Sequence, residues 1–351
     1  MEKLIKQITL LILILLMSWG VEAQSLRISP QSKTIRYVGR FSDDYRFGWT
    51  GCLIETDFQG LELSADLEVV EGSAAALTVV VDGQPHFLKI SKDRKTYRLF
   101  QGSENSKKHR IALFKRSEGS LGTVRFHGFQ ASEGATFSRP PDPSRKMLVV
   151  GDSITCGYGN EAKTLAEGNT LENENGYMSY AAIAARMLNA DLMMFCWSGR
   201  GMYRNYQAKN YYEGTIPKIF DRTLPFSAQP QWDHSRFVPD IIVINLGTND
   251  TNLNGGKKPL PKHEFIAAYR KFLDRLRALA PKSKIILSIG PMGFDPVREW
   301  LPEIAKEYEN TTVLTYAPFD GADDLGGHHH PSVKKDLEMA KELVTAIKKT
   351  L

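Results

Sequence analysis

One serine stands where a buried strand is predicted to end. The apolar run MLVV at 147–150 leads directly into the segment GDSITCGYG, which contains Ser153. A serine at such a turn, flanked by glycines, exposes its hydroxyl and has backbone N–H groups directed toward it, as a catalytic nucleophile requires. Serine is also a common helix N-cap. The motif by itself therefore fits a nucleophile and a structural cap equally well.

Two further predicted strand ends carry the parts of an oxyanion hole. The run DLMMFCW is followed by SGRG with Gly199, and the run DIIVINL is followed by GTND with Asn249. Gly199 can bring its backbone N–H close to a substrate, and the amide of Asn249 can donate to the same developing oxyanion. Each segment is also a common turn sequence. Their placement after successive buried strands favours a shared site at the carboxyl ends of a parallel sheet.

A histidine cluster follows the last predicted strand, TVLTYA. His328, His329 and His330 stand directly before Pro331 and a predicted helix. A histidine here could reach Ser153 across the top of the sheet, and the chain order Ser then His suits an α/β hydrolase. Three adjacent imidazoles could instead bind zinc or nickel. Adjacent residues project in different directions, however, so one site seldom uses all three, and we expect no metal.

The elements that must position these residues fall into two regions of different periodicity. Residues 24–138 contain short β-branched and aromatic runs separated by turn signals, including the hairpin pair Asp82-Gly83, and predict a β-sandwich or jelly roll. The proline-rich segment at 139–146 is expected to be a linker. Residues 147–351 alternate continuous apolar runs with amphipathic helical stretches, which predicts a parallel sheet covered by helices.

The first 23 residues are expected to be a signal peptide. Lys3 and Lys6 precede an apolar run of about ten residues, and small residues end at Ala23. A membrane span needs roughly 20 apolar residues. We therefore expect cleavage after Ala23, no membrane anchor in the mature chain, and a secreted or periplasmic protein.

The overall charge argues against one class of partner. The chain has 45 Lys and Arg against 40 Asp and Glu, a net charge of +5 spread over 351 residues. A nucleic-acid-binding protein normally carries a concentrated basic stripe. We therefore expect no nucleic-acid partner, while the oligomeric state stays open.

Four segments together resemble a known family. GDSITCGYGN, SGRGMYRN, GTND and HHHPSVKK are similar to the four blocks of the SGNH (GDSL) hydrolase superfamily, and more narrowly to the acetyl esterases of carbohydrate esterase family 2. The resemblance spans nearly the whole mature chain. It implies an N-terminal β jelly roll and a C-terminal SGNH domain with a flavodoxin-like parallel sheet. It further implies Ser153 as nucleophile, His330 as general base, and an oxyanion hole formed by Gly199, Asn249 and the Ser153 N–H.

One position departs from the superfamily pattern. SGNH enzymes commonly have an aspartate three residues before the catalytic histidine, and here that residue is Gly327. Asp323 and Asp324 could act as the third member only if the following glycines loop back. Some members of the resembled family instead use a Ser-His dyad in which a backbone carbonyl orients the imidazole. We favour the dyad.

Several other residues have two interpretations. Tyr158, Trp197, Tyr203 and Trp300 could stack on a sugar ring or simply pack in the protein interior. Cys156 and Cys196 could form a disulfide after export or remain buried thiols.

The resemblance predicts a secreted esterase that removes O-acetyl groups from plant polysaccharides such as xylan or glucomannan, or from their oligosaccharides. Serine acyl-enzyme chemistry requires a nucleophile, a base and oxyanion donors, so we expect no metal and no organic cofactor. Two rivals remain. One is a secreted GDSL lipase or thioesterase acting on other acyl esters, and the other is a non-catalytic carbohydrate-binding protein.

Overall fold

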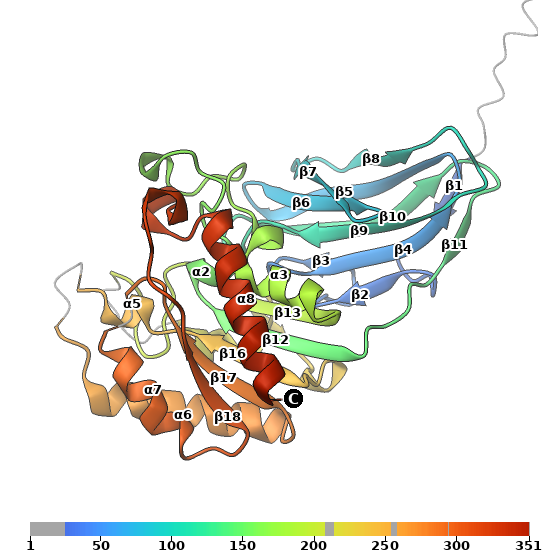
Figure 1. Cartoon of the computed structure of the whole chain (residues 1–351). Helices are drawn as coiled ribbons and strands as arrows, with labels where there is room; N and C mark the ends of the chain where they lie inside the picture. Colours follow the sequence, from blue (N-terminus) through green and yellow to red (C-terminus); the bar gives the residue numbers. More distant parts are fainter. Residues whose placement is uncertain (1–24, 208–213, 254–257, 294, 351) are drawn as a thin grey trace, which may run out of the picture.

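The structure is a computed structural model that describes residues 25–207, 214–253, 258–293 and 295–350. The predicted signal peptide at 1–23 lies outside the described residues. Figure 1 shows two regions packed side by side, an all-β region and a region in which helices cover a sheet. We call residues 25–138 the β-sandwich domain and residues 145–350 the α/β domain.

The β-sandwich domain consists of two antiparallel sheets, in the orders β1-β10-β5-β8, with β3 on β10, and β11-β4-β9-β6-β7, with β2 on β4. In β5, alternate side chains Leu63, Ala65 and Leu67 are fully buried, as expected where one sheet face packs on another. The predicted hairpin is confirmed, because Asp82 and Gly83 join β6 to β7 with φ of 50° and 84°. The strands are β1 (Leu26–Ile28), β2 (Arg36–Val38), β3 (Arg46–Phe47), β4 (Leu53–Gln59), β5 (Glu62–Gly72), β6 (Ala75–Val81), β7 (Gln84–Ile90), β8 (Lys95–Gln101), β9 (Lys108–Lys115), β10 (Gly122–Ala131) and β11 (Thr136–Ser138).

The α/β domain contains a five-stranded sheet in the order β13-β12-β16-β17-β18, with every neighbouring pair parallel. Numbered from its own first strand, this is the order 2-1-3-4-5 of the flavodoxin-like fold. The predicted fold class is therefore confirmed. The strands, with a separate hairpin of β14 and β15, are β12 (Arg145–Gly151), β13 (Ala190–Cys196), β14 (Arg222–Leu224), β15 (Ser227–Gln231), β16 (Ile241–Asn245), β17 (Lys284–Ile289) and β18 (Thr311–Thr315).

Helices cover both faces of this sheet (Figure 1). Met147 and Val149 of β12 pack with apolar residues of α3 and α8, while Leu148 and Val150 pack with those of α6 and α7. This two-sided burial explains why the strands are continuous apolar runs. The α-helices are α2 (Ser153–Cys156), α3 (Tyr180–Met187), α4 (Ile216–Ile219), α5 (Thr248–Thr251), α6 (Lys262–Leu279), α7 (Val297–Ala305) and α8 (Val333–Thr350), and the 3₁₀ helices are η1 (Leu165–Glu167), η2 (Gly176–Met178), η3 (His234–Arg236), η4 (Ala322–Asp324) and η5 (Gly327–His329).

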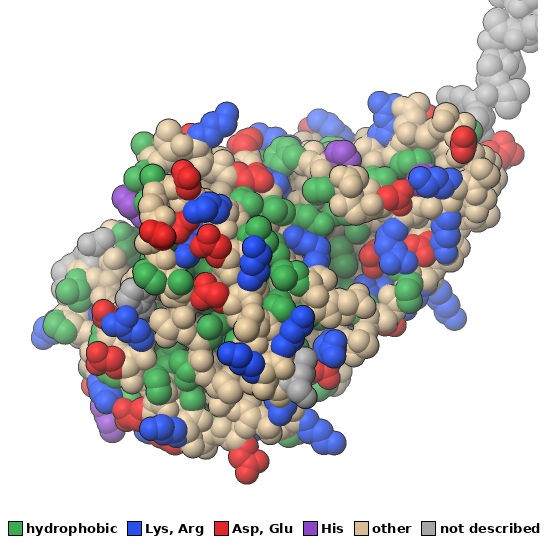
Figure 2. All heavy atoms as spheres, viewed as in Figure 1, with side chains coloured by type: hydrophobic (Ala, Val, Ile, Leu, Met, Phe, Trp, Pro, Cys, Tyr) green, Lys and Arg blue, Asp and Glu red, His purple; other side chains and the backbone are tan. Residues whose placement is uncertain are grey.

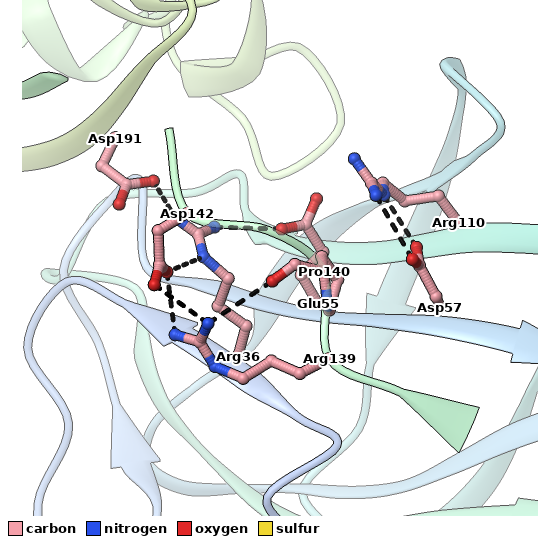
Figure 3. A network of polar contacts seen from close by, with 8 residues as sticks. All are labelled: Arg36, Glu55, Asp57, Arg110, Arg139, Pro140, Asp142 and Asp191. Atoms are coloured by element: carbon pink, nitrogen blue, oxygen red, sulfur yellow. Dashed lines mark hydrogen bonds and ion pairs between the residues drawn. The ribbon is translucent and has the colours of Figure 1, made fainter. Parts of the chain in front are cut away.

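A buried arginine joins the two domains and the segment between them (Figure 3). Arg36 of β2 is 3% exposed and forms ion pairs with Glu55 at 3.0 Å, with Asp142 at 2.8 Å, and with Asp191 of β13. Asp142 lies in the expected linker, which is thus held against both domains. Strand β12 starts at Arg145, so the last two residues of the expected linker belong to the strand, because Arg145 already pairs with the first residue of β13.

The surface carries charges of both signs. On the face that Figure 2 shows, Lys and Arg side chains intermingle with Asp and Glu. Within the described ranges, no helix has both the length and the apolar character needed to cross a membrane.

Candidate active site

Ser153 lies at the point where β12 ends and α2 begins. The side chain of the preceding residue, Asp152, caps this helix by accepting the N–H of Ile154 at 3.1 Å. A Cβ on Gly151 would lie 1.9 Å from Oγ1 of Thr155, so the close turn requires glycine there. The cap of this helix is therefore Asp152 and not Ser153, so the Ser153 side chain is left to make another contact.

That contact is with His330. The Oγ of Ser153 lies 2.8 Å from Nε2 of His330, and Nδ1 of the same ring lies 3.3 Å from the backbone oxygen of His328. A proton on Nδ1 can point to this carbonyl, which leaves Nε2 to accept the serine proton. Burial lowers the pKa of His330 to about 4, so its ring is neutral at pH 7 and Nε2 is free of a proton.

The carbonyl of His328 is directed by an unusual backbone. His328 and His329 have φ of 49° and 63°, in the left-handed region that few non-glycine residues adopt. The Nδ1 of His328 lies 2.9 Å from the hydroxyl of Tyr158, whose ring stacks on His330 with centroids 4.1 Å apart. Sequence reasoning favoured a backbone carbonyl in this role but did not identify His328 as its source, because no side-chain pattern reports where a carbonyl points.

The two candidate acids take different places. Asp324 is fully buried and accepts hydrogen bonds from Nζ of Lys334 at 2.5 Å and from the N–H of Asp320 at 2.8 Å. Asp323 is exposed, and its backbone oxygen accepts from the hydroxyl of Ser332. Among the described residues, neither carboxylate contacts His330. The structure therefore favours the Ser-His dyad over a triad.

The candidate oxyanion residues lie on adjacent strand ends. Gly199 follows β13, Ser153 follows β12 and Asn249 follows β16, and these three strands are neighbours in the sheet. The Nδ2 of Asn249 donates to Oδ2 of Asp152 at 3.1 Å and to the backbone oxygen of Arg200 at 3.0 Å. The Asn249 amide thus lies between the Ser153 turn and the Gly199 turn. Its two N–H groups make these two contacts, so donation to a substrate requires one of them to be exchanged.

Two buried carboxylates support this arrangement. Asp250 accepts the N–H groups of Met202 at 2.9 Å and Tyr203 at 2.7 Å, which ties the segment after Gly199 to helix α5. Burial raises the pKa of Asp250 to about 6 and that of Asp152 to about 7. Both side chains accept hydrogen bonds from groups around the serine: Asp152 from Ile154 and Asn249, and Asp250 from the segment after Gly199.

The four candidate sugar-stacking residues have different environments. Tyr158 covers His330, as described above. Trp197 is half-buried between Trp49 and the guanidinium of Arg200, which lies 4.6 Å from its ring centre, and Tyr203 is also half-buried. Trp300 follows the second of its two interpretations: the ring is 8% exposed in α7 and packs on Phe265 of α6, because α7 turns its apolar face to the sheet.

The cysteines follow the second of their two interpretations. Cys156 and Cys196 are both buried as free thiols. In the described part of the chain, no group of three or more His, Cys, Asp and Glu side chains is arranged to hold a metal ion. The three histidines diverge, since His328 contacts Tyr158 while His330 contacts Ser153.

Both domains match family models. The carbohydrate esterase 2 N-terminal model matches residues 37–141, and the GDSL-like lipase/acylhydrolase model matches residues 149–334. A solved structure of a family two carbohydrate esterase from Clostridium thermocellum, in complex with cellohexaose, is 34% identical with a TM-score of 0.83, covering 90% of this chain and 98% of that chain.

Two curated relatives are named as esterases. The chain is 35% identical over 334 residues to the cellulase/esterase CelE of Acetivibrio thermocellus, covering 90% of this chain but 39% of the relative's length. It is 27% identical over 338 residues to an acetylxylan esterase / glucomannan deacetylase of Cellvibrio japonicus, covering 92% of this chain and 91% of that protein.

Proposed function

Because this chain belongs to carbohydrate esterase family 2, we propose that it removes O-acetyl groups from plant polysaccharides or their oligosaccharides by serine acyl-enzyme chemistry. The observation that carries the proposal is the 2.8 Å contact between Ser153 Oγ and His330 Nε2, with Nδ1 of the same ring at the His328 carbonyl. This contact supports the hydroxyl as the nucleophile, because a neutral imidazole beside it can take its proton.

The reaction proceeds in two halves. Ser153 Oγ attacks the acetyl carbonyl as its proton moves to His330 Nε2, and the oxyanion is stabilised by the N–H groups of Ser153 and Gly199 and the amide of Asn249. His330 then protonates the departing sugar oxygen, which leaves an acetyl-enzyme. Water, deprotonated by His330, attacks the ester, and Ser153 leaves with that proton, releasing acetate.

The substrate class rests on the relatives. One curated relative is named an acetylxylan esterase / glucomannan deacetylase, and one solved relative was captured with cellohexaose. The half-buried rings of Trp197 and Tyr203 are our candidates for contact with the sugar. We further propose that residues 1–23 direct the protein to the periplasm or the medium.

The test measures acetate released from acetylated xylan, acetylated glucomannan and p-nitrophenyl acetate. Ser153→Ala and His330→Ala should abolish release with little change in thermal midpoint. The exposed neighbour His329, replaced by Asn to suit its left-handed backbone, is the matched control and should retain most of the rate. Equal kcat/KM on long-chain esters would favour a lipase, and oligosaccharide binding without acetate release would favour a binding protein; either result would overturn the proposal.

A further inference from the structure

The N–H of Gly199 can serve the oxyanion hole only if its turn has one particular form. Residues 197–200 form a four-residue turn closed by the Arg200 N–H, which donates to the Trp197 oxygen at 3.2 Å. Gly199 occupies the third position with φ of 77°, as in a type II turn. A type I turn would reverse the direction of the peptide between Ser198 and Gly199, and with it the Gly199 N–H. We call residues 197–200 the oxyanion turn.

The group that holds this turn comes from the other domain. Glu118 lies in the loop between β9 and β10 of the β-sandwich domain and is 4% exposed. Its Oε2 accepts the N–H of Ser198 at 2.9 Å. Hydrogen bonds from a backbone N–H to a carboxylate are about twice as strong as neutral ones, and this one acts on the residue directly before Gly199.

Contacts from both domains fix the position of the loop that contains Glu118. Its own N–H donates to Oε2 of Glu174, a fully buried residue of the α/β domain, at 3.0 Å. Nζ of the fully buried Lys115 donates to the oxygen of Ser117 at 2.7 Å and to its hydroxyl at 2.8 Å, which fixes the loop from within the β-sandwich domain. The carboxylate therefore reaches Ser198 from an anchored loop.

We infer that Glu118 is a positioning residue for the oxyanion hole, by which the β-sandwich domain keeps the Gly199 N–H directed at the developing oxyanion. This role rests on the proposed acyl transfer at Ser153. It also means that the β-sandwich domain contributes to the rate of the chemical step, independently of any contact it makes with polysaccharide. Sequence reasoning missed Glu118, because a single glutamate in a surface-like segment, KRSEGS, carries no sign of burial.

The first test compares Glu118→Ala with Glu118→Gln on p-nitrophenyl acetate. The alanine variant should lose about 10²–10³ in kcat, the range for loss of one oxyanion donor, with KM within about threefold. The glutamine variant should stay close to the wild type, since its amide oxygen can still accept the Ser198 N–H. Methylboronic acid, which forms a tetrahedral adduct on the serine, should lose affinity in the alanine variant by a factor similar to the loss in kcat.

The second test restores the turn without the carboxylate. Proline is favoured at the second position of a type II turn, so Ser198→Pro combined with Glu118→Ala should recover most of the lost kcat. A double variant that folds but stays at the level of Glu118→Ala would overturn the inference.

The matched control is Asp191→Asn, which weakens a different contact between the domains, at the end of β13 far from Gly199. It should lower the thermal midpoint and leave kcat and boronate affinity unchanged. An active Ser153→Ala variant would overturn the proposed function itself. An inactive Ser153→Ala with wild-type kcat and boronate affinity in Glu118→Ala would overturn the positioning role alone.

Discussion

At the scale of single residues, the chemistry depends on a histidine that stays neutral. Burial, with Tyr158 stacked on the ring, lowers the pKa of His330 from 6.5 to about 4. The unfolded chain takes up this proton near pH 6.5 but the folded protein only near pH 4. Protonation of His330 in the unfolded chain is therefore expected to lower the free energy of unfolding progressively as the pH falls from 6.5 to about 4. NMR titration of histidine-labelled protein, with His330→Ala for assignment, should show a midpoint near 4; a midpoint at 6.5 or above would contradict it.

A second prediction at this scale concerns the acid that a triad would require. Asp324 is engaged with Lys334 and the N–H of Asp320, and Asp323 faces solvent. Asp324→Asn should lower the thermal midpoint, because it weakens the buried contact with Lys334, yet keep kcat within about tenfold, a barrier change of up to roughly 1.4 kcal/mol. Asp323→Ala should leave both quantities nearly unchanged. A loss in kcat approaching 10⁴ in either folded variant, as removal of a triad acid can cause, would restore the triad.

At the level of elements, the loop that contains η1 packs against the loop that contains His328 and His330. Gly168 has φ of 60°, and a Cβ there would lie 2.4 Å from Cε1 of the His328 ring. Gly168→Ala should push His328 aside, move its carbonyl away from Nδ1 of His330, and lower kcat at least about tenfold, a barrier increase of roughly 1.4 kcal/mol. Steady-state kinetics on p-nitrophenyl acetate measure this effect.

The matched control for Gly168 is Gly83 in the β6–β7 hairpin. It has φ of 84° and nothing within 4 Å of an added Cβ. Both alanine variants carry the backbone strain of the left-handed region, about 1–2 kcal/mol, but only Gly168→Ala meets the catalytic loop. Wild-type kcat in Gly168→Ala would show that the position of His328 does not matter.

In the whole molecule, the buried ion pairs of Arg36 drawn in Figure 3 connect the two domains. Arg36→Met would leave Asp191, 9% exposed, without its buried partner, and the free energy of unfolding should fall by about 3–5 kcal/mol. Guanidinium unfolding measures the loss. The control is Lys89→Ala, which removes an exposed ion pair between the domains, with Glu172, and should change stability little. A loss for Arg36→Met no larger than for Lys89→Ala would contradict this role.

Local patterns in the sequence were enough to predict two regions of different architecture and the strand ends that the candidate site residues follow. Continuous apolar runs and short alternating runs are local patterns, so they predicted the parallel sheet and the sandwich without knowledge of any distant contact. Ser153, Gly199 and Asn249 followed from the same pattern, because the carboxyl ends of parallel strands meet at one edge of a sheet.

Which particular groups meet could be read only from the folded chain. The carbonyl at His330 Nδ1 is that of His328, the ring of Trp300 packs on α6, and Glu118 crosses a domain boundary to reach Ser198. Each of these facts depends on the relative placement of segments far apart in the chain. Periodicity and motif spacing describe only neighbours in sequence, so contacts of this kind are set by the packing of whole elements.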